Sequence, residues 1–225
     1  MTAAVHVVNA LRATKLFAAA PDDVVEQLAA SATVRQLRRR QVLFDRESRG
    51  DSLVVIAKGR LRVTVRSADG SEFALTLLSV GDTLGELSVV DGGARSADAE
   101  AVDDCTVITI DRGAVRAAIR SSPDLAEEVL HRLAADLRRL TDLTADLVFL
   151  DLPRRLAKLL IELATPSDDG QQLTMSQEDL AHHVGATRQS INAALRGFER
   201  RGWISIGNRR MLVRDEAALA RFASS

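Results

Sequence analysis

The segment from Gln177 to Arg196 constrains the fold of this chain more than any other part of the sequence. Its apolar residues are spaced as the inner faces of two short helices on either side of Gly185, which can take the left-handed backbone conformation that a tight interhelical turn requires. Ser176 and Thr187 are residue types that cap helix N-termini. The segment therefore predicts a helix-turn-helix whose inner face consists of Leu180, Ala181, Val184, Ile191 and Leu195.

The second helix of this unit carries side chains suited to reading DNA. Arginine can bond to guanine with two hydrogen bonds, glutamine and asparagine can do so with adenine, and serine and threonine suit phosphates. A β-hairpin is expected from Trp203 to Val213, turning at Gly207-Asn208, with Arg209 and Arg210 placed like the wing of a winged helix. A helical hairpin that merely packs is the alternative, but caps, turn and wing agree. The expected DNA contacts are Thr187, Arg188, Gln189, Ser190, Asn192 and Arg209.

The chain before about Arg112 has mainly the pattern of β-strands. Apolar and charged residues alternate in Leu61 to Val65, Asp69-Gly70 suits a hairpin turn, and the alternation resumes at Phe73, Leu75 and Leu77. Thr106 to Ile110 is another β-branched run. Several short strands with regular turns predict a sandwich or roll.

A long helix is expected after Pro123, to about Leu150. Its apolar stripe is narrow and flanked by charges, which favours a coiled-coil seam between two chains over a helix that lies against its own domain. Asp151-Leu152-Pro153 is expected to be a hinge, with a new helix starting near Pro153. The seam consists of Leu130, Leu133, Leu137, Leu140, Thr144 and Leu147.

Composition excludes several classes of protein. The chain of 225 residues is 46% hydrophobic and 27% charged, as in ordinary globular proteins, and its net charge is -1. From Pro153 onward, however, 11 Arg and Lys stand against 8 Asp and Glu, which fits a basic DNA-binding part on an acidic body. No membrane span or signal peptide is visible, so we expect a cytoplasmic protein.

No catalytic or metal-binding constellation is visible in the sequence. Cys105 has no second cysteine for a disulfide or a metal cluster and is expected to be a small core residue, and the histidines are scattered. We therefore expect no catalytic residues, no metal ligands and no tightly bound cofactor, and hence no enzyme.

The run from Gly85 to Ala97 suggests an anion-binding loop. A glycine lets backbone amides approach a phosphate, Arg95 and Ser96 supply charge and a hydroxyl donor, and Glu86 can accept bonds from a sugar hydroxyl. Taken alone, such residues would more often form a surface turn with a solvated ion pair.

With these motifs in order, the chain resembles the cyclic-AMP receptor protein / fumarate-nitrate regulator (CRP/FNR) family over nearly its whole length. Gly85-Glu86-Leu87 and Arg95-Ser96-Ala97 are similar to the two halves of that family's phosphate-binding cassette. The resemblance implies an α+β chain with a cyclic-nucleotide-binding, jelly-roll-like β-roll over residues 1–122. A dimerisation helix and hinge over 123–152 and a winged helix-turn-helix domain over 153–225 would follow.

The resemblance also implies the ligand and the partners. Cyclic AMP, or a related cyclic nucleotide, is the expected effector of a homodimer that binds a two-fold symmetric site in double-stranded DNA and contacts RNA polymerase. Glu86 would bind the ribose hydroxyl, Arg95 and Ser96 the cyclic phosphate, and nearby amides would assist. The implied ligand contacts are Gly85, Glu86, Leu87, Ser88, Arg95, Ser96 and Thr141.

Departures from the family pattern leave the signal open. Of the two adjacent polar residues that contact adenine in cyclic-AMP-responsive members, only Thr141 is polar here, because the other position is Leu140. Gln189 and Ala193 depart from the usual reading helix, so a different half-site is expected. Regulation without cyclic nucleotide, or by another small molecule, is one alternative. A nucleotide-binding subunit that docks on a protein partner is another.

Overall fold

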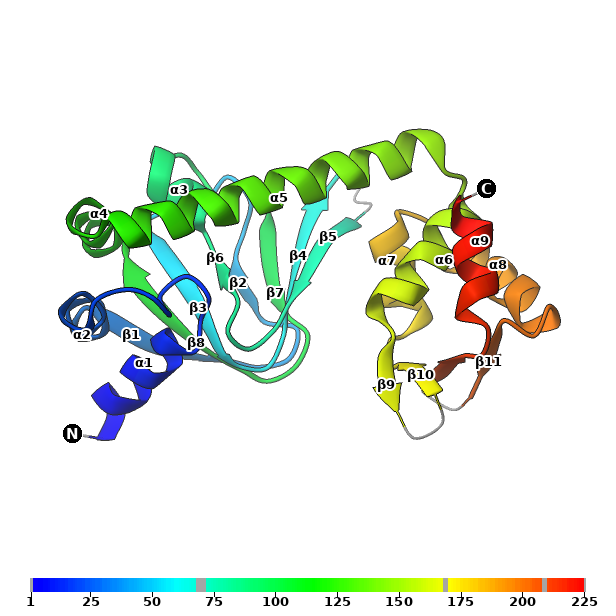
Figure 1. The fold of residues 1–225 in the computed structure, drawn as a ribbon, viewed down its shortest axis with the longest axis horizontal. Coiled ribbons are helices and arrows are strands. Elements are labelled where there is room, and N and C mark those ends of the chain that lie inside the picture. The colour runs from blue at the N-terminus through cyan, green and yellow to red at the C-terminus, as the bar shows by residue number, and fades with distance from the viewer. Residues whose placement is uncertain (1, 68–71, 168–169, 208–209, 225) are drawn as a thin grey trace. The chain divides into compact units, whose positions relative to one another are not determined.

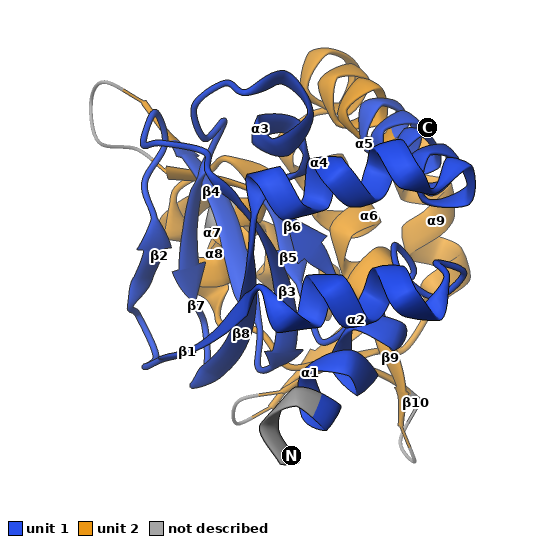
Figure 2. Ribbon diagram, turned by 90° about the vertical axis from the view of Figure 1, so that its left-hand side faces the viewer, with its two compact units in different colours: residues 1–65, 75–138 blue, residues 66–74, 139–225 orange. Residues whose placement is uncertain are grey.

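The structure of the protein is a computed structural model that describes residues 2–67, 72–167, 170–207 and 210–224 (Figure 1). The chain divides into two compact units, residues 1–65 with 75–138 and residues 66–74 with 139–225 (Figure 2). The division falls within one long helix, α5 (Pro123–Phe149). Among the described residues, no helix has both the length and the apolar character to cross a membrane.

Two antiparallel sheets form the roll that the strand pattern predicts. In the first, the strands lie in the order β1 (Ala32–Leu37), β8 (Cys105–Asp111), β3 (Ser52–Lys58) and β6 (Thr83–Leu84). In the second, the order is β2 (Val42–Phe44), β7 (Asp98–Ala101), β4 (Leu61–Arg66) and β5 (Glu72–Leu78). One apolar cluster joins the two sheets and includes Leu37, Leu43, Val54, Ile56, Leu61, Ala99 and Val107.

Helices cover the outer face of the first sheet, and of these only the long helix α5 was predicted from the sequence. These are α1 (Thr2–Arg12), α2 (Asp22–Ala30), α4 (Arg112–Ser121) and the start of α5 (Figure 2). Because β3 has helices on one face and the second sheet on the other, it is apolar without alternation. The helix-side core includes Leu11, Phe17, Val25, Leu28, Leu53, Val55, Ile108, Ile110, Val115 and Leu125.

Burial along β5 does not follow the alternation of its large apolar residues. Phe73, Leu75 and Leu77 are only half-buried, whereas Ala74 and Leu78 are buried. An alternating pattern defines two faces of a strand, but it does not say which face meets the core.

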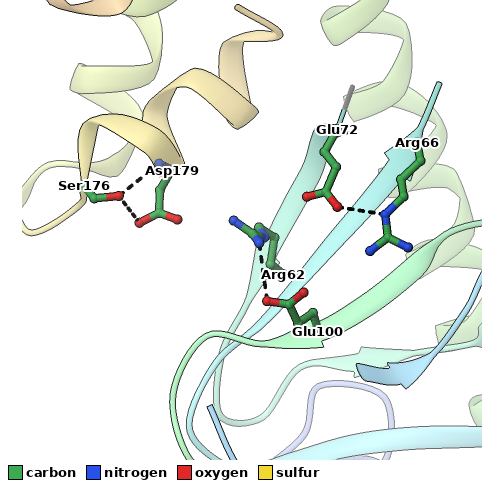
Figure 3. Close-up of polar contacts among 6 residues, drawn as sticks. All are labelled: Arg62, Arg66, Glu72, Glu100, Ser176 and Asp179. Atoms are coloured by element: carbon green, nitrogen blue, oxygen red, sulfur yellow. Dashed lines mark hydrogen bonds and ion pairs between the residues drawn. The ribbon is translucent and has the colours of Figure 1, made fainter. Parts of the chain in front are cut away.

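The charged positions of β4 form ion pairs instead of standing free. Arg62 Nη2 lies 3.5 Å from Glu100 Oε1 on β7, and Arg66 Nε donates to Glu72 Oε1 at 2.8 Å (Figure 3). Thr64, which stands between apolar Val63 and Val65, is buried opposite Asp98. This strand is therefore covered more fully than its alternation predicts.

The second unit contains the helix-turn-helix and its supporting elements. Its helices are α6 (Leu152–Leu163), α7 (Gln177–Val184), α8 (Arg188–Arg200) and α9 (Glu216–Ser224). Its strands are β9 (Thr165–Ser167), β10 (Gly170–Leu173), β11 (Ile204–Ile206) and β12 (Met211–Val213), in the sheet order β11-β12-β10-β9. The pairing of β11 with β12 forms the expected hairpin, although its turn residue Asn208 lies outside the described residues.

The hinge segment begins α6 as the sequence predicts. Asp151 Oδ1 accepts a hydrogen bond from the Arg154 amide at 3.0 Å, and Pro153 lies in the first turn of the helix. Phe198, Trp203 and Phe222 pack their rings together, with centroids 5.4–5.8 Å apart. These contacts link α8, the hairpin and α9 into one core.

Candidate nucleotide-binding and DNA-binding sites

Gly85 is the residue around which the candidate nucleotide site is built. It precedes the short helix α3 (Glu86–Asp91) in a left-handed conformation, with φ of +96°. A Cβ at this position would lie 2.1 Å from Nη1 of Arg95 and 2.9 Å from the carbonyl oxygen of Ser52. A side chain here would therefore occupy the place of the guanidinium group, so the glycine is required by space as well as by backbone conformation.

Arg95 is buried, with only 4% of its surface exposed. Its Nη2 donates to Ser52 Oγ at 2.9 Å, and its guanidinium lies 4.2 Å from the centre of the Phe44 ring. Among the described residues, Nε and Nη1 of Arg95 have no hydrogen-bond partner. Burial lowers the pKa of Arg95, while the charges of Asp51 and Glu86 raise it. A buried cation with unfilled donors is costly unless an anion binds to it, and its fork of donors matches a phosphate.

Glu86 lies at the start of α3 and faces the same region as Arg95. The Thr83 hydroxyl donates a hydrogen bond to its Oε1. Burial raises the pKa of Glu86, and the hydrogen bond from Thr83 and the charge of Arg132 lower it. Glu86 thus offers an acceptor for a hydroxyl group and Arg95 offers cationic N–H donors for an anion, the two functions that a sugar phosphate requires.

The other expected ligand contacts differ in their surroundings. Ser88 is buried, and its hydroxyl donates to the Ala94 carbonyl at 3.3 Å, so its side chain already serves the loop. Leu87 and Ser96 are exposed. Thr141 is exposed on α5, in the part of that helix that belongs to the second unit.

The structure also agrees with the expectation for Cys105. It is buried in the apolar cluster between the two sheets, and burial raises the pKa of its thiol. Within the described part of the chain, no group of three or more His, Cys, Asp or Glu side chains is arranged to hold a metal ion.

Both helix caps of the helix-turn-helix are present. Ser176 Oγ accepts from the Asp179 amide at 3.1 Å and donates to the Asp179 carboxylate at 2.7 Å (Figure 3). Thr187 Oγ1 accepts from the Ser190 amide at 3.2 Å and lies 2.9 Å from the Ser190 hydroxyl. Gly185 has φ of +66°, as the turn demands.

The outward face of α8 is polar and lies along a shallow hollow. Arg188, Gln189 and Ser190 are exposed, and Asn192 is half-buried, while Ile191 and Leu195 face the core. Arg209, the remaining expected DNA contact, lies outside the described residues. The hollow is lined by Gln177, Arg188, Gln189, Asn192, Ala193 and Arg196.

The hollow brings in two residues that were not among the expected contacts. Arg196 follows Arg188 and Asn192 at intervals of four residues, a spacing that places all three on one helix face and could have identified it. Gln177 lies at the start of α7 and lines the hollow because α7 packs beside α8. Helical spacing within α8 cannot predict a residue from another helix.

Arg155 is a further residue that the sequence did not single out. Its Nη1 donates to the Leu150 carbonyl at 3.0 Å, and its Nη2 donates to the Val184 carbonyl at 3.4 Å. One side chain thus joins the end of α5, the start of α6 and the end of α7.

Comparison with known proteins identifies the family. The family model described as "Cyclic nucleotide-binding domain" matches residues 34–122, and the model "Crp-like helix-turn-helix domain" matches residues 154–222. The "CRP-like cAMP-activated global transcriptional regulator" of Mycobacterium tuberculosis is 36% identical over 210 residues, which cover 88% of this chain and 94% of that protein. The chain belongs to the CRP/FNR family. It is a DNA-binding transcription regulator with a cyclic-nucleotide-binding domain, and not an enzyme.

Other CRP/FNR relatives agree over most of the chain. The "cAMP-activated global transcriptional regulator CRP" of Salmonella typhimurium is 26% identical over 198 residues, covering 85% of this chain and 94% of its own. A CRP-family transcriptional regulator of Thermus thermophilus has a TM-score of 0.71 at 26% identity, covering 85% and 97% of the two chains. The c-di-GMP-responsive regulator CLP of Xanthomonas campestris has a TM-score of 0.77 at 20% identity, covering 86% and 99%, and shows the shared fold alone.

Proposed function

We propose that this CRP/FNR regulator is a cytoplasmic homodimer whose affinity for DNA is controlled by cyclic AMP. Binding of a cyclic nucleotide is supported chiefly by the buried Arg95, whose Nε and Nη1 lack hydrogen-bond partners among the described residues. A cyclic phosphate would supply both the negative charge and the acceptor oxygens. Relatives described as cAMP-activated support cyclic AMP as the nucleotide.

In this proposal, the residues of the cassette divide the ligand between them. Arg95 and Ser96 bind the cyclic phosphate, Glu86 accepts from the ribose hydroxyl, and backbone amides from Gly85 to Ser88 assist. Thr141 contacts the adenine. Since Ser96 is exposed, its hydroxyl is free to turn toward a bound phosphate at little cost.

The dimer is supported by the apolar stripe of α5. Leu130 and Leu137 are about two-thirds exposed, and Leu140 and Leu147 also present large apolar surface. Leucines repeated at seam spacing and left uncovered favour a second copy of the same helix as their partner. We propose residues 1–122 as the nucleotide domain, 123–152 as the dimerisation helix and hinge, and 153–225 as the DNA-binding domain.

The proposed binding of DNA rests on the outward, polar face of α8. Arg188, Gln189 and Asn192 would read base edges in the major groove, and Thr187, Ser190 and Arg209 would contact phosphates. Because a homodimer presents two such helices, its site would be two-fold symmetric. RNA polymerase is the proposed protein partner of the DNA-bound dimer.

Titration calorimetry with cyclic AMP and cyclic GMP tests the ligand. We expect saturable binding of cyclic AMP by the wild-type protein and none by Arg95→Ala, with circular dichroism to show that the variant is folded. Absence of heat with either nucleotide, in folded wild-type protein, would contradict the proposed ligand.

A regulator that does not use cyclic AMP is a second candidate. It is favoured by Leu140, which stands at an adenine-contact position and cannot hydrogen-bond to an amino group. Its signature would be the same affinity for operator DNA with and without cyclic AMP.

A further inference from the structure

The Glu86 carboxylate of the candidate nucleotide site lies in an unusual charge environment. Glu86 accepts from the Thr83 hydroxyl, and Asp136 of α5 raises its pKa further while Arg132 of α5 lowers it. Arg95 is a further charged group that interacts with Glu86. The carboxylates of Glu86 and Asp136 thus both lie near Arg132, and Glu86 is the expected sugar acceptor.

Arg132 is held between the roll and its own helix. Its Nη2 donates to the main-chain carbonyl of Thr83 at 3.4 Å, and its Nε donates to Asp136 Oδ2, one helical turn away, at 3.4 Å. Thr83 is the same residue whose hydroxyl binds Glu86. Arg132 therefore supports Glu86 in two ways, through its charge and through the backbone that carries the Thr83 hydroxyl.

An ionised Glu86 is needed if it is to accept a hydrogen bond from a sugar hydroxyl, yet burial favours its protonated form. The α5 cation offsets that cost and the α5 carboxylate adds to it. We propose that Arg132 is the positioning residue that keeps Glu86 ionised and oriented for the nucleotide sugar, and that Asp136 tunes this effect. The inference rests on the proposed function, because it assigns a role within that nucleotide site.

This arrangement makes α5 part of the nucleotide site at Arg132, about two helical turns before Leu140 and Thr141, the positions proposed to meet the adenine. A hydroxyl that donates to Glu86 takes over part of the stabilisation that Arg132 supplies in the ligand-free protein. Binding of the sugar and the placement of the Arg132 side chain are thereby linked, which gives α5 a differential interaction with the two ligation states.

The test measures the titration of Glu86 directly in the ligand-free full-length protein. Carbon NMR of the labelled glutamate carboxyls, with Glu86→Gln used to assign the signal, follows the pH midpoint of Glu86. We expect a higher midpoint in Arg132→Gln and a lower one in Asp136→Asn. Arg132→Lys keeps the charge and should return the midpoint toward the wild-type value, and Arg138→Gln, an exposed arginine on the same helix, should leave it unchanged.

Cyclic AMP binding provides the second readout. As pH falls through the Glu86 midpoint the carboxylate is lost, so affinity should be lost at a higher pH in Arg132→Gln and at a lower pH in Asp136→Asn. At neutral pH we expect Arg132→Gln to weaken binding about 10-fold, the scale of one charge-assisted hydrogen bond.

The outcomes separate this inference from the proposed function. Midpoints that do not move, or that move in the same direction in Arg132→Gln and Asp136→Asn, would overturn the role of Arg132, whether or not cyclic AMP binds. If wild-type protein failed to bind cyclic AMP while the two midpoints moved in opposite directions, the proposed ligand would be wrong and the role of Arg132 in keeping Glu86 ionised would stand.

Discussion

Gly85 and Arg95 show how single residues determine what the nucleotide site can hold. The place that a side chain at residue 85 would occupy is taken by the Arg95 guanidinium. The motif in the sequence identified both residues, but not this steric relation between them. The burial of Arg95 against Phe44 also could not be predicted, because the two residues are distant in the chain and meet only after the roll has folded.

Substitution of Gly85 by alanine should abolish cyclic AMP binding. The new Cβ would overlap the Arg95 guanidinium. The alanine would also have to adopt the left-handed backbone conformation of Gly85, which costs about 1–3 kcal/mol in stability. Thermal unfolding and calorimetry measure the two effects. Gly197→Ala is the matched control, because its Cβ would meet only Arg201 Nη1 at 3.5 Å, and it should leave nucleotide binding intact. Retained binding in Gly85→Ala would contradict the described geometry.

The burial of Glu86 implies that its ionised carboxylate lowers the stability of the fold while it favours ligand binding. Its folded-state pKa is raised, so the folded protein binds this proton more tightly than the unfolded chain does. Its contribution to stability is therefore fully present below the unfolded value and is lost as pH rises through the folded value. Glu86→Gln should remove this dependence, raise the melting temperature at neutral pH, and weaken cyclic AMP binding by about 10-fold or more. A melting temperature lowered at neutral pH would contradict the prediction.

At the scale of elements, α8 was the most predictable part of the chain. Thr187, Gly185 and the apolar spacing are local signals, and each has the predicted conformation or contact. The residues Gln177 and Arg196 were missed because the hollow along α8 depends partly on how α7 packs beside it.

Arg188→Ala tests the reading role of α8. The substitution should weaken specific DNA binding by about 1–3 kcal/mol and reduce specificity at one base position of the operator, because an arginine that bonds to guanine recognises that base. Anisotropy with a panel of single-base operator variants measures both effects. Arg200→Ala, an exposed arginine at the other end of α8, is the control. An equal loss on all DNA sequences would make Arg188 a phosphate contact instead.

The long helix α5 was predicted together with its seam, and its proposed partner can be tested with matched variants. Leu137 and Val148 are each 67% exposed, but only Leu137 lies on the seam. Burying a leucine is worth about 1.5–3 kcal/mol, and each dimer contains two copies. Leu137→Asp should therefore weaken dimerisation by about 100-fold or more in analytical ultracentrifugation, and Val148→Asp should have little effect. Equal behaviour of the two variants would contradict the seam.

For the whole molecule, the sequence predicted the order of parts better than their surfaces. The roll, the long helix and the winged helix-turn-helix follow from changes in hydrophobic period and from capping and turn residues, which are local. The helices α1 and α2 and the buried face of β5 depend on what packs against what, and local patterns do not contain that information. For the same reason the contacts of Arg155, which join three elements, appeared only in the structure.

In the proposed function, a ligand at the Glu86 and Arg95 site changes DNA binding by the face of α8. Such coupling requires that cyclic AMP and operator DNA each strengthen the binding of the other by the same factor. Coupling between sites in proteins is commonly about 1–3 kcal/mol, or about 5- to 150-fold in affinity. An operator selected from random DNA in the presence of cyclic AMP supplies the probe.

The most direct measurement is the affinity of the wild-type protein for that operator, by fluorescence anisotropy, as cyclic AMP is titrated at constant salt. We predict a saturable increase of about 5- to 150-fold, absent in Arg95→Ala. The same affinity with and without cyclic AMP would contradict the proposed function.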